Sequence, residues 1–218
     1  MITDAFNIPL VIMCGGRGSR LRPATDFIPK ALVPVNGQPI IDHVVSFFAS
    51  NGIQDCYLCV GYRGDQIRSH FQKQQLNMNI HFSNSGDKAG ILERIFALRE
   101  NLPDRFIVAY CDTFIDIDVA ELNNFHVNAG VPITMVTGPI QSPFGLVERD
   151  EDGRAVFFDE KPIQEYFLGC FVMECQLLRE LSEDLVSQPD GAGVVALFQE
   201  LVDQGKIAAY SHQGLNIT

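Results

Sequence analysis

The sequence predicts an α/β fold, in which a Rossmann-like, mixed and mostly parallel sheet is flanked by helices. Three observations support this prediction. Short apolar runs alternate with helix-like segments through the first half of the chain, as βαβ units require. A glycine-rich loop at residues 14–30 directly follows the first apolar run. The second half contains a hairpin signal, which makes that part of the sheet partly antiparallel.

The first half alternates between predicted strands and helices. Residues 8–13 read I-P-L-V-I-M, an apolar run that is typical of a buried strand. The segment 39–51 predicts a helix with Pro39 in its first turn and an apolar face, ended by Asn51 and Gly52. The same reasoning predicts strands at 55–60, 78–83 and 106–110 and helices at 64–73 and 91–100.

The second half has a different character. A predicted helix at 118–129 precedes a strand at 131–137. Residues 145–149 and 155–158 flank the sequence D-E-D-G, which is typical of a hairpin turn. The remaining elements are a strand at 167–173 and helices at 175–186 and 193–204. Since no linker or internal repeat interrupts the pattern, residues 1–218 are expected to form a single domain.

Composition limits the class of function. The 218 residues are 46% hydrophobic, which is enough for a sizeable core, and their formal net charge is -11. An acidic chain is a poor partner for nucleic acid or an anionic membrane surface, because both attract basic faces. No apolar stretch approaches the roughly 18 residues of a membrane helix. The first residues, M-I-T-D, lack a signal-peptide pattern. A cytoplasmic protein is therefore expected.

The cysteines and histidines favour structural roles. The six cysteines occur mainly inside apolar runs, and residues 56–59 read C-Y-L-C. This spacing is shared by redox and zinc motifs. However, it falls in a predicted strand, where residues three apart face opposite sides of the sheet, and a second ligand pair is missing. Buried thiols are therefore expected. The five histidines have neither metal spacing nor a nearby candidate nucleophile.

The glycine-rich loop is the main candidate binding element. Glycines let a tight turn bring backbone N–H groups close to a ligand. Residues 14–30 carry four cations against one acid, on a chain that is acidic overall. A polyphosphate ligand is the simplest explanation. Because ligands of such sheets bind beyond the carboxyl ends of the strands, Asp112, just after the predicted strand at 106–110, is expected on the same rim.

Three phosphate-binding motifs compete for this loop. A P-loop requires a Lys-Ser/Thr pair that is absent, and a dinucleotide fingerprint requires a glycine where Leu21 stands. The loop of sugar-phosphate nucleotidylyltransferases reads G-G-x-G-[ST]-R-L-x-P-x-T, followed by P-K. Residues 15–25 read G-G-R-G-S-R-L-R-P-A-T, and residues 29–30 read P-K. The chain therefore resembles that family over this loop at every defined position.

The resemblance covers essentially the whole chain. The segments at 32–41, 61–63, 86–92, 109–112, 144–145 and 159–162 follow in the family's order. Residues 84–87 (N-S-G-D) and 110–118 (Y-C-D-T-F-I-D-I-D) look most like those of glucose-1-phosphate cytidylyltransferases. The resemblance implies the fold of nucleotide-diphospho-sugar transferases.

The resemblance also implies an activity. The family transfers a nucleotidyl group from a nucleoside triphosphate, here with CTP favoured, to a sugar-1-phosphate with Mg²⁺. The attacking phosphate oxygen is already ionised, so the reaction needs charge neutralisation and no protein nucleophile. By family position Arg20 and Lys30 hold the phosphates, Asp112 ligates Mg²⁺ and Lys161 contacts the sugar phosphate. The same positions assign Gly15, Gly16, Gly18, Ser19, Gly86, Asp87 and Gly90 to the nucleotide, and Gly145, Glu160, Lys161 and Gly169 to the sugar phosphate.

The chain departs from the family pattern in four places. The family's T-G-G is K-A-G at residues 88–90, a cysteine precedes Asp112 in place of glycine, and residues 166–169 lack the family's asparagine. The family's second metal-binding Asp lies in a late segment that would begin about where the sequence reaches Thr218. The alternatives are therefore a non-catalytic nucleotide- or sugar-phosphate-binding homologue, another phosphorylated acceptor, or GTP or UTP as donor. The oligomeric state is left open, and a homo-oligomer is compatible with the sequence.

Overall fold

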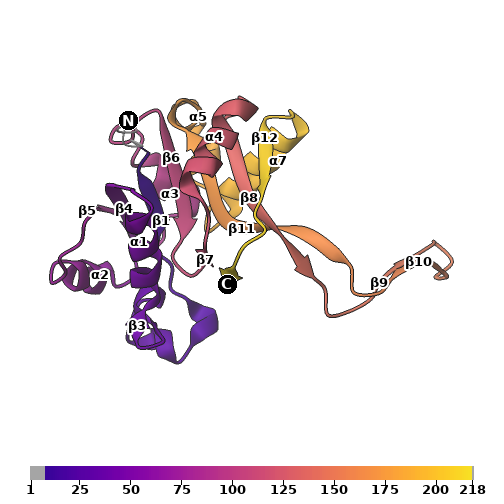
Figure 1. The fold of residues 1–218 in the computed structure, drawn as a ribbon, viewed down its shortest axis with the longest axis horizontal. Helices are drawn as coiled ribbons and strands as arrows, with labels where there is room; N and C mark the ends of the chain where they lie inside the picture. The colour runs from indigo at the N-terminus through magenta and orange to yellow at the C-terminus, as the bar shows by residue number, and fades with distance from the viewer. Residues whose placement is uncertain (1–7, 218) are drawn as a thin grey trace.

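A seven-stranded sheet organises the protein, as shown by a computed structural model that describes residues 8–217 (Figure 1). Only the antiparallel strand β11 interrupts six parallel strands, so the predicted mixed and mostly parallel sheet is confirmed. From one edge to the other the strands are β12 (Ile207–Ser211), β8 (Ile133–Gln141), β11 (Ile163–Glu174), β6 (Arg105–Tyr110), β1 (Leu10–Met13), β4 (Asp55–Val60) and β5 (Asn79–Asn84).

Helices cover both faces of this sheet, and each face has its own apolar cluster. One cluster combines inward side chains of the strands with those of α1 (Ile40–Ser50), α2 (Gly64–Phe71) and α4 (Val119–Ala129). The other contains side chains of α3 (Ile91–Phe96), α5 (Cys175–Arg179), α6 (Glu183–Val186) and α7 (Ala192–Asp203). Period-two alternation along the buried strands supplies both clusters.

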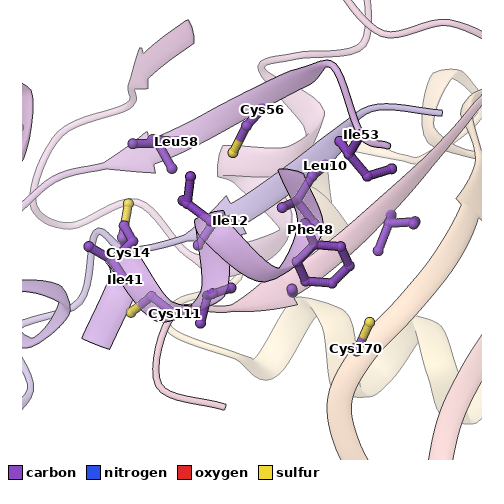
Figure 2. Packing of buried hydrophobic residues seen from close by; sticks show 14 of the residues in the cluster. Leu10, Ile12, Cys14, Ile41, Phe48, Ile53, Cys56, Leu58, Cys111 and Cys170 are labelled. Carbon is purple, nitrogen blue, oxygen red and sulfur yellow. The ribbon is translucent and has the colours of Figure 1, made fainter. Parts of the chain in front are cut away.

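The cysteines belong to these cores, as the sequence predicted. Cys56 lies in the first cluster and Cys59 in the second, because residues three apart on β4 face opposite sides of the sheet. Figure 2 shows Cys14, Cys56, Cys111 and Cys170 among the aliphatic side chains of the first cluster. All six cysteines are free and buried.

The structure corrects the predicted helix at 175–186. The chain forms two short helices instead, because α5 ends at Arg179 and the Ser182 side chain caps α6 by accepting from the Leu185 N–H at 3.4 Å. The strand β12, which adds to the edge of the sheet beside β8, was also not predicted from the sequence. Its sequence, I-A-A-Y-S, is short and only weakly apolar.

The predicted hairpin is confirmed and forms an arm, residues 142–162. Its strands are β9 (Leu146–Arg149) and β10 (Ala155–Asp159), and the Asp150 N–H donates to the Arg154 carbonyl at 3.0 Å across the turn. Figure 1 shows this arm projecting from the body of the molecule. Every residue of both strands is exposed.

Two short strand pairs complete the fold. The first joins β2 (Pro34–Val35) to β3 (Gln38–Pro39), just before α1. The second joins β7 (Phe114–Ile115) to β13 (Asn216–Ile217), which brings the end of the described chain beside the segment that follows Asp112. None of the helices described is long and apolar enough to cross a bilayer.

Candidate active site

The glycine-rich loop leaves β1 at its carboxyl end and folds back on itself. Gly18 has φ +59, and a Cβ there would lie 2.8 Å from the Lys30 Cβ. The Thr25 hydroxyl donates to the Gly18 carbonyl at 2.8 Å. Only glycine combines this left-handed backbone with so close an approach. These contacts hold the two ends of the loop together and therefore fix the position of the Lys30 backbone.

The loop forms one wall of a pocket of about 680 Å³. The other walls come from the segments after β5 and β6 and from the turn before α7, so the pocket lies at the carboxyl end of the sheet, as expected for such folds. The lining residues are Met13, Cys14, Gly15, Gly16, Arg17, Gly18, Ser19, Arg20, Leu21, Lys30, Asp87, Lys88, Ala89, Ile91, Arg94, Tyr110, Cys111, Asp112, Asp190 and Gly191.

Lys30 and Asp112 form an ion pair in this pocket. The Lys30 ammonium donates to Asp112 Oδ2, and the two side chains are 27% and 28% exposed. Lys30 comes from the loop and Asp112 from the segment just after β6, and the two residues are 82 positions apart in the chain. A cation and a carboxylate that are both reachable from solvent can act on a phosphate and on a divalent cation, respectively.

The segment after β5 faces the loop across the pocket mouth. Arg17 Nη2 lies 3.7 Å from Asp87 Oδ2, and the Arg17 guanidinium lies 5.2 Å from the centre of the Tyr62 ring. The Gly86 N–H donates to Asn84 Oδ1 at 2.9 Å, which shapes the turn before Asp87. These contacts are exposed, so a ligand could displace them at low cost.

The pocket offers no thiolate or histidine. Burial raises the pKa of Cys111 to about 12, with the Asp112 charge adding to the effect and Lys30 opposing it. Each histidine has a protein partner, and none of them lines the pocket. Within residues 8–217 no group of three or more His, Cys, Asp or Glu could hold a metal ion. The carboxylates of the pocket lining are those of Asp87, Asp112 and Asp190, so any metal here would rely on one or two of them and on the ligand.

Most of the residues expected at the nucleotide converge on this pocket. Arg20 and Ser19 lie in the exposed turn at Ser19–Leu21, and both line it. Gly86 and Gly90 do not line it. The Gly86 carbonyl instead accepts from Arg94, and Gly90 precedes α3 and packs against the backbone of residue 188. The expected nucleotide residues that line the pocket are Gly15, Gly16, Gly18, Ser19, Arg20, Lys30 and Asp87.

The residues expected at the sugar phosphate lie outside this lining. Gly145 and Glu160 face each other on the arm, where a Cβ on Gly145 would lie 3.3 Å from Glu160 Oε2. Lys161 is exposed at the base of the arm, and its carbonyl accepts from the Gln141 amide at 3.4 Å. Gly169 lies in β11 against Tyr110. A Cβ on Gly169 would lie 3.1 Å from Tyr110, which does line the pocket.

Arg94 is a pocket residue that was not predicted from the sequence. Its side chain lines the pocket, is buried in spite of its charge, and donates to the carbonyls of Val60 and Gly86 at 2.6 and 2.7 Å. The only signal in the sequence was a charged residue between the apolar positions Leu92 and Ile95 of α3. Asp190 and Gly191 were also missed, because they reach the pocket only through the fold.

Comparison with known proteins finds similar sequences along most of the chain. The profile of the family described as nucleotidyl transferase matches residues 10–211. The chain is 26% identical to the glucose-1-phosphate cytidylyltransferase of Salmonella typhi, over 94% of this chain and 88% of that protein. It is also 26% identical to the UTP–glucose-1-phosphate uridylyltransferase of Synechocystis, over 89% of this chain but only 55% of that protein's length.

A solved structure has a similar fold. HddC from Yersinia pseudotuberculosis, complexed with GMP-PN, superposes with a TM-score of 0.72. The two chains are 18% identical, and the match covers 96% of this chain and 92% of HddC. At this identity the comparison shows a shared fold.

Proposed function

The chain belongs to the nucleotidyl transferase family, and on that premise we propose that it transfers a nucleotidyl group from a nucleoside triphosphate to a sugar-1-phosphate. The observation that carries the proposal is the meeting of the phosphate-binding loop, Lys30 and Asp112 in one pocket. Similarity to named sugar-1-phosphate nucleotidyltransferases along most of the chain supports it.

The proposed step is a displacement at the α-phosphorus of the nucleotide. A phosphate oxygen of the sugar-1-phosphate attacks that phosphorus and forms a new P–O bond. The bond from the α-phosphorus to its bridging oxygen breaks, and pyrophosphate leaves with the electron pair. The attacking oxygen is ionised at neutral pH, so no general base is required. This agrees with a pocket that holds neither thiolate nor histidine.

The residues of the pocket lower the repulsion between the two anions. Lys30 and Arg20 both line the pocket, so Lys30 would contact the reacting phosphate and Arg20, in the exposed turn, would contact the outer phosphates. Backbone N–H groups of the loop add donors that need no reorganisation. The pair of Lys30 with Asp112 keeps the ammonium oriented before the substrates bind.

Mg²⁺ fits this donor set. Mg²⁺ usually keeps several waters and is bound through one or two carboxylates and the substrate phosphates, so a preformed cage is unnecessary. Asp112 would hold it. When bound, the ion would neutralise negative charge on the phosphates.

CTP is the proposed donor nucleotide. Asp87 at the pocket mouth offers a carboxylate, which accepts hydrogen bonds from the exocyclic amine of cytosine. Uracil presents an oxygen at the same position, which the carboxylate would repel. The match to a cytidylyltransferase over 88% of that protein also supports CTP.

A turnover screen tests the proposal. Pyrophosphate release is measured for CTP, UTP, GTP and ATP against a panel of sugar-1-phosphates with Mg²⁺. We expect one pair to turn over, and Arg20→Ala and Asp112→Asn to abolish most of that rate. Arg179→Ala and Asp203→Asn serve as matched controls outside the pocket and should retain it. Turnover that survives both pocket substitutions would refute the assigned roles.

A nucleotide-binding protein without turnover is the second candidate. The observation in its favour is that the arm residues Gly145, Glu160 and Lys161 lie outside the pocket lining. This candidate predicts that nucleotides raise the melting temperature while no product forms. Detection of any nucleotide-sugar product eliminates it.

A further inference from the structure

Arg94 carries an uncompensated buried charge. Its residue is 5% exposed, and no other Arg, Lys, Asp or Glu within residues 8–217 is classed as buried. Its two hydrogen-bond acceptors are the carbonyl oxygens of Val60 and Gly86. No carboxylate in the same part of the chain lies within 4.0 Å of its nitrogens. Carbonyls satisfy its N–H groups but leave its charge unneutralised.

Two glycines make room for the guanidinium. A Cβ on Gly15 would lie 2.5 Å from Arg94 Cζ, and a Cβ on Gly61 would lie 2.7 Å from Arg94 Nη2. Gly15 is itself buried and begins the phosphate-binding loop, whereas Gly61 follows β4. A side chain at either position would force the guanidinium to shift from this place. Gly15 therefore serves to admit Arg94 beneath the loop.

Arg94 also joins the ends of three neighbouring strands. The guanidinium packs against Gly15 after β1, donates to Val60 at the end of β4 and donates to Gly86 after β5. The Tyr62 N–H donates to the Gly15 carbonyl at 3.1 Å and closes the same junction. The Arg94 guanidinium thus contacts both the phosphate-binding loop and the segment that leads to Asp87.

A buried charge without a counter-ion is normally avoided, because removing a charge from water is unfavourable. Arg94 lines the pocket, so an anion bound there would supply the missing negative charge. We propose that Arg94 is a positioning residue of the nucleotide site, which holds the phosphate-binding loop and the Gly86 turn together and whose charge is balanced by the bound triphosphate. This inference rests on the proposed function, since it assumes a triphosphate in the pocket.

The experiment compares Arg94→Met, Arg94→Lys and the control Arg99→Met. Arg99 follows the same helix, but its guanidinium stacks on Phe96 and does not line the pocket. Inorganic tripolyphosphate is titrated into each protein by calorimetry, and melting temperatures verify folding. Arg94→Met should weaken tripolyphosphate binding by about 10- to 100-fold, as expected for one unit charge near a polyanion in a partly buried site. Arg94→Lys should recover most of the affinity, and Arg99→Met should bind as the wild type does.

A second variant fills the space that Gly15 leaves for the guanidinium, without removing the charge of Arg94. Gly15→Ala keeps the backbone N–H but displaces the guanidinium. It should therefore weaken tripolyphosphate binding when introduced alone, and much less when it is added to Arg94→Met. This variant also decides the matter if Arg94→Met fails to fold. Unchanged affinity in Gly15→Ala would then overturn the inference.

The outcomes separate this inference from the proposed function. Equal loss of affinity in Arg94→Lys and Arg94→Met would show that the charge is irrelevant and that Arg94 has only a packing role. Wild-type affinity in Arg94→Met would overturn the inference while nucleotide transfer could still be observed. A wild-type protein that binds neither tripolyphosphate nor any nucleoside triphosphate would refute the proposed function itself.

Discussion

Replacing Lys30 with methionine should remove most of the activity and little of the stability. Methionine keeps the length of the side chain but loses the charge. At an effective dielectric constant of about 20, two unit charges about 4 Å apart attract by about 4 kcal/mol. Lys30 is 27% exposed, so this intermediate value is the appropriate one. Removal of one such preorganised group typically lowers kcat by about 10²- to 10³-fold, or 2.7–4 kcal/mol.

The stability of the variant should change much less. Lys30 and Asp112 are both partly solvated, so the loss of their pair is expected to cost at most about 1 kcal/mol. Pyrophosphate release gives kcat/KM, and urea unfolding gives the free energy of unfolding. Lys73→Met, outside the pocket, is the control. A Lys30→Met enzyme within about threefold of wild-type kcat/KM, well below the 10²-fold expected for such a group, would refute the role of Lys30.

Three further predictions concern the loop and the core. Gly18→Ala should destabilise the fold by about 1–3 kcal/mol and weaken tripolyphosphate binding, because Gly18 has φ +59 and a Cβ would lie 2.8 Å from the Lys30 Cβ; calorimetry showing wild-type affinity would contradict this. Burial lowers the pKa of His126; the neighbouring Arg105 charge adds to this effect, and Glu174 opposes it. The unfolded chain therefore takes up the proton more readily than the folded protein, and the free energy of unfolding should fall as the pH drops below about 6.5. Urea midpoints of His126→Gln should depend less on pH over this range, and a curve parallel to that of the wild type would count against the assignment. Burial raises the pKa of Cys59 and Cys170 to about 12, so the native protein should resist a thiol reagent at pH 8 and react fully in urea; rapid labelling of the native protein would disprove it.

The parallel half of the fold could be predicted from its periodicity. The strand at 55–60 matches β4, and the helix at 39–51 differs from α1 only at its ends. Buried strands and amphipathic helices leave this signal because the faces that they bury set the period of their apolar residues. The edge strand β12 pairs with β8 but has no buried residue, so it lacks the apolar signal of the central strands and could not be predicted in the same way.

The residues of the candidate site could also be predicted from the sequence only in part. Residues 14–30 form a local motif, so the sequence alone was sufficient to find the loop and Lys30. Asp112 could be placed because the carboxyl ends of parallel strands share one edge. Arg94 could not, because its burial depends on space left by Gly15 and Gly61 at the ends of two other strands. The arm follows a recognisable hairpin signal, but its position relative to the pocket depends on how the long strands β8 and β11 leave the sheet.

The most direct test of nucleotide transfer at this pocket follows the oxygen atoms of the reaction. Glucose-1-phosphate with ¹⁸O in its phosphate is incubated with CTP, Mg²⁺ and the protein, and the products are analysed by mass spectrometry. Attack of the sugar phosphate on the α-phosphorus predicts a CDP-sugar that carries all of the label, together with unlabelled pyrophosphate. Label in the pyrophosphate, or no nucleotide-sugar with any of the four nucleotides and the panel of sugar-1-phosphates, would contradict the proposed function.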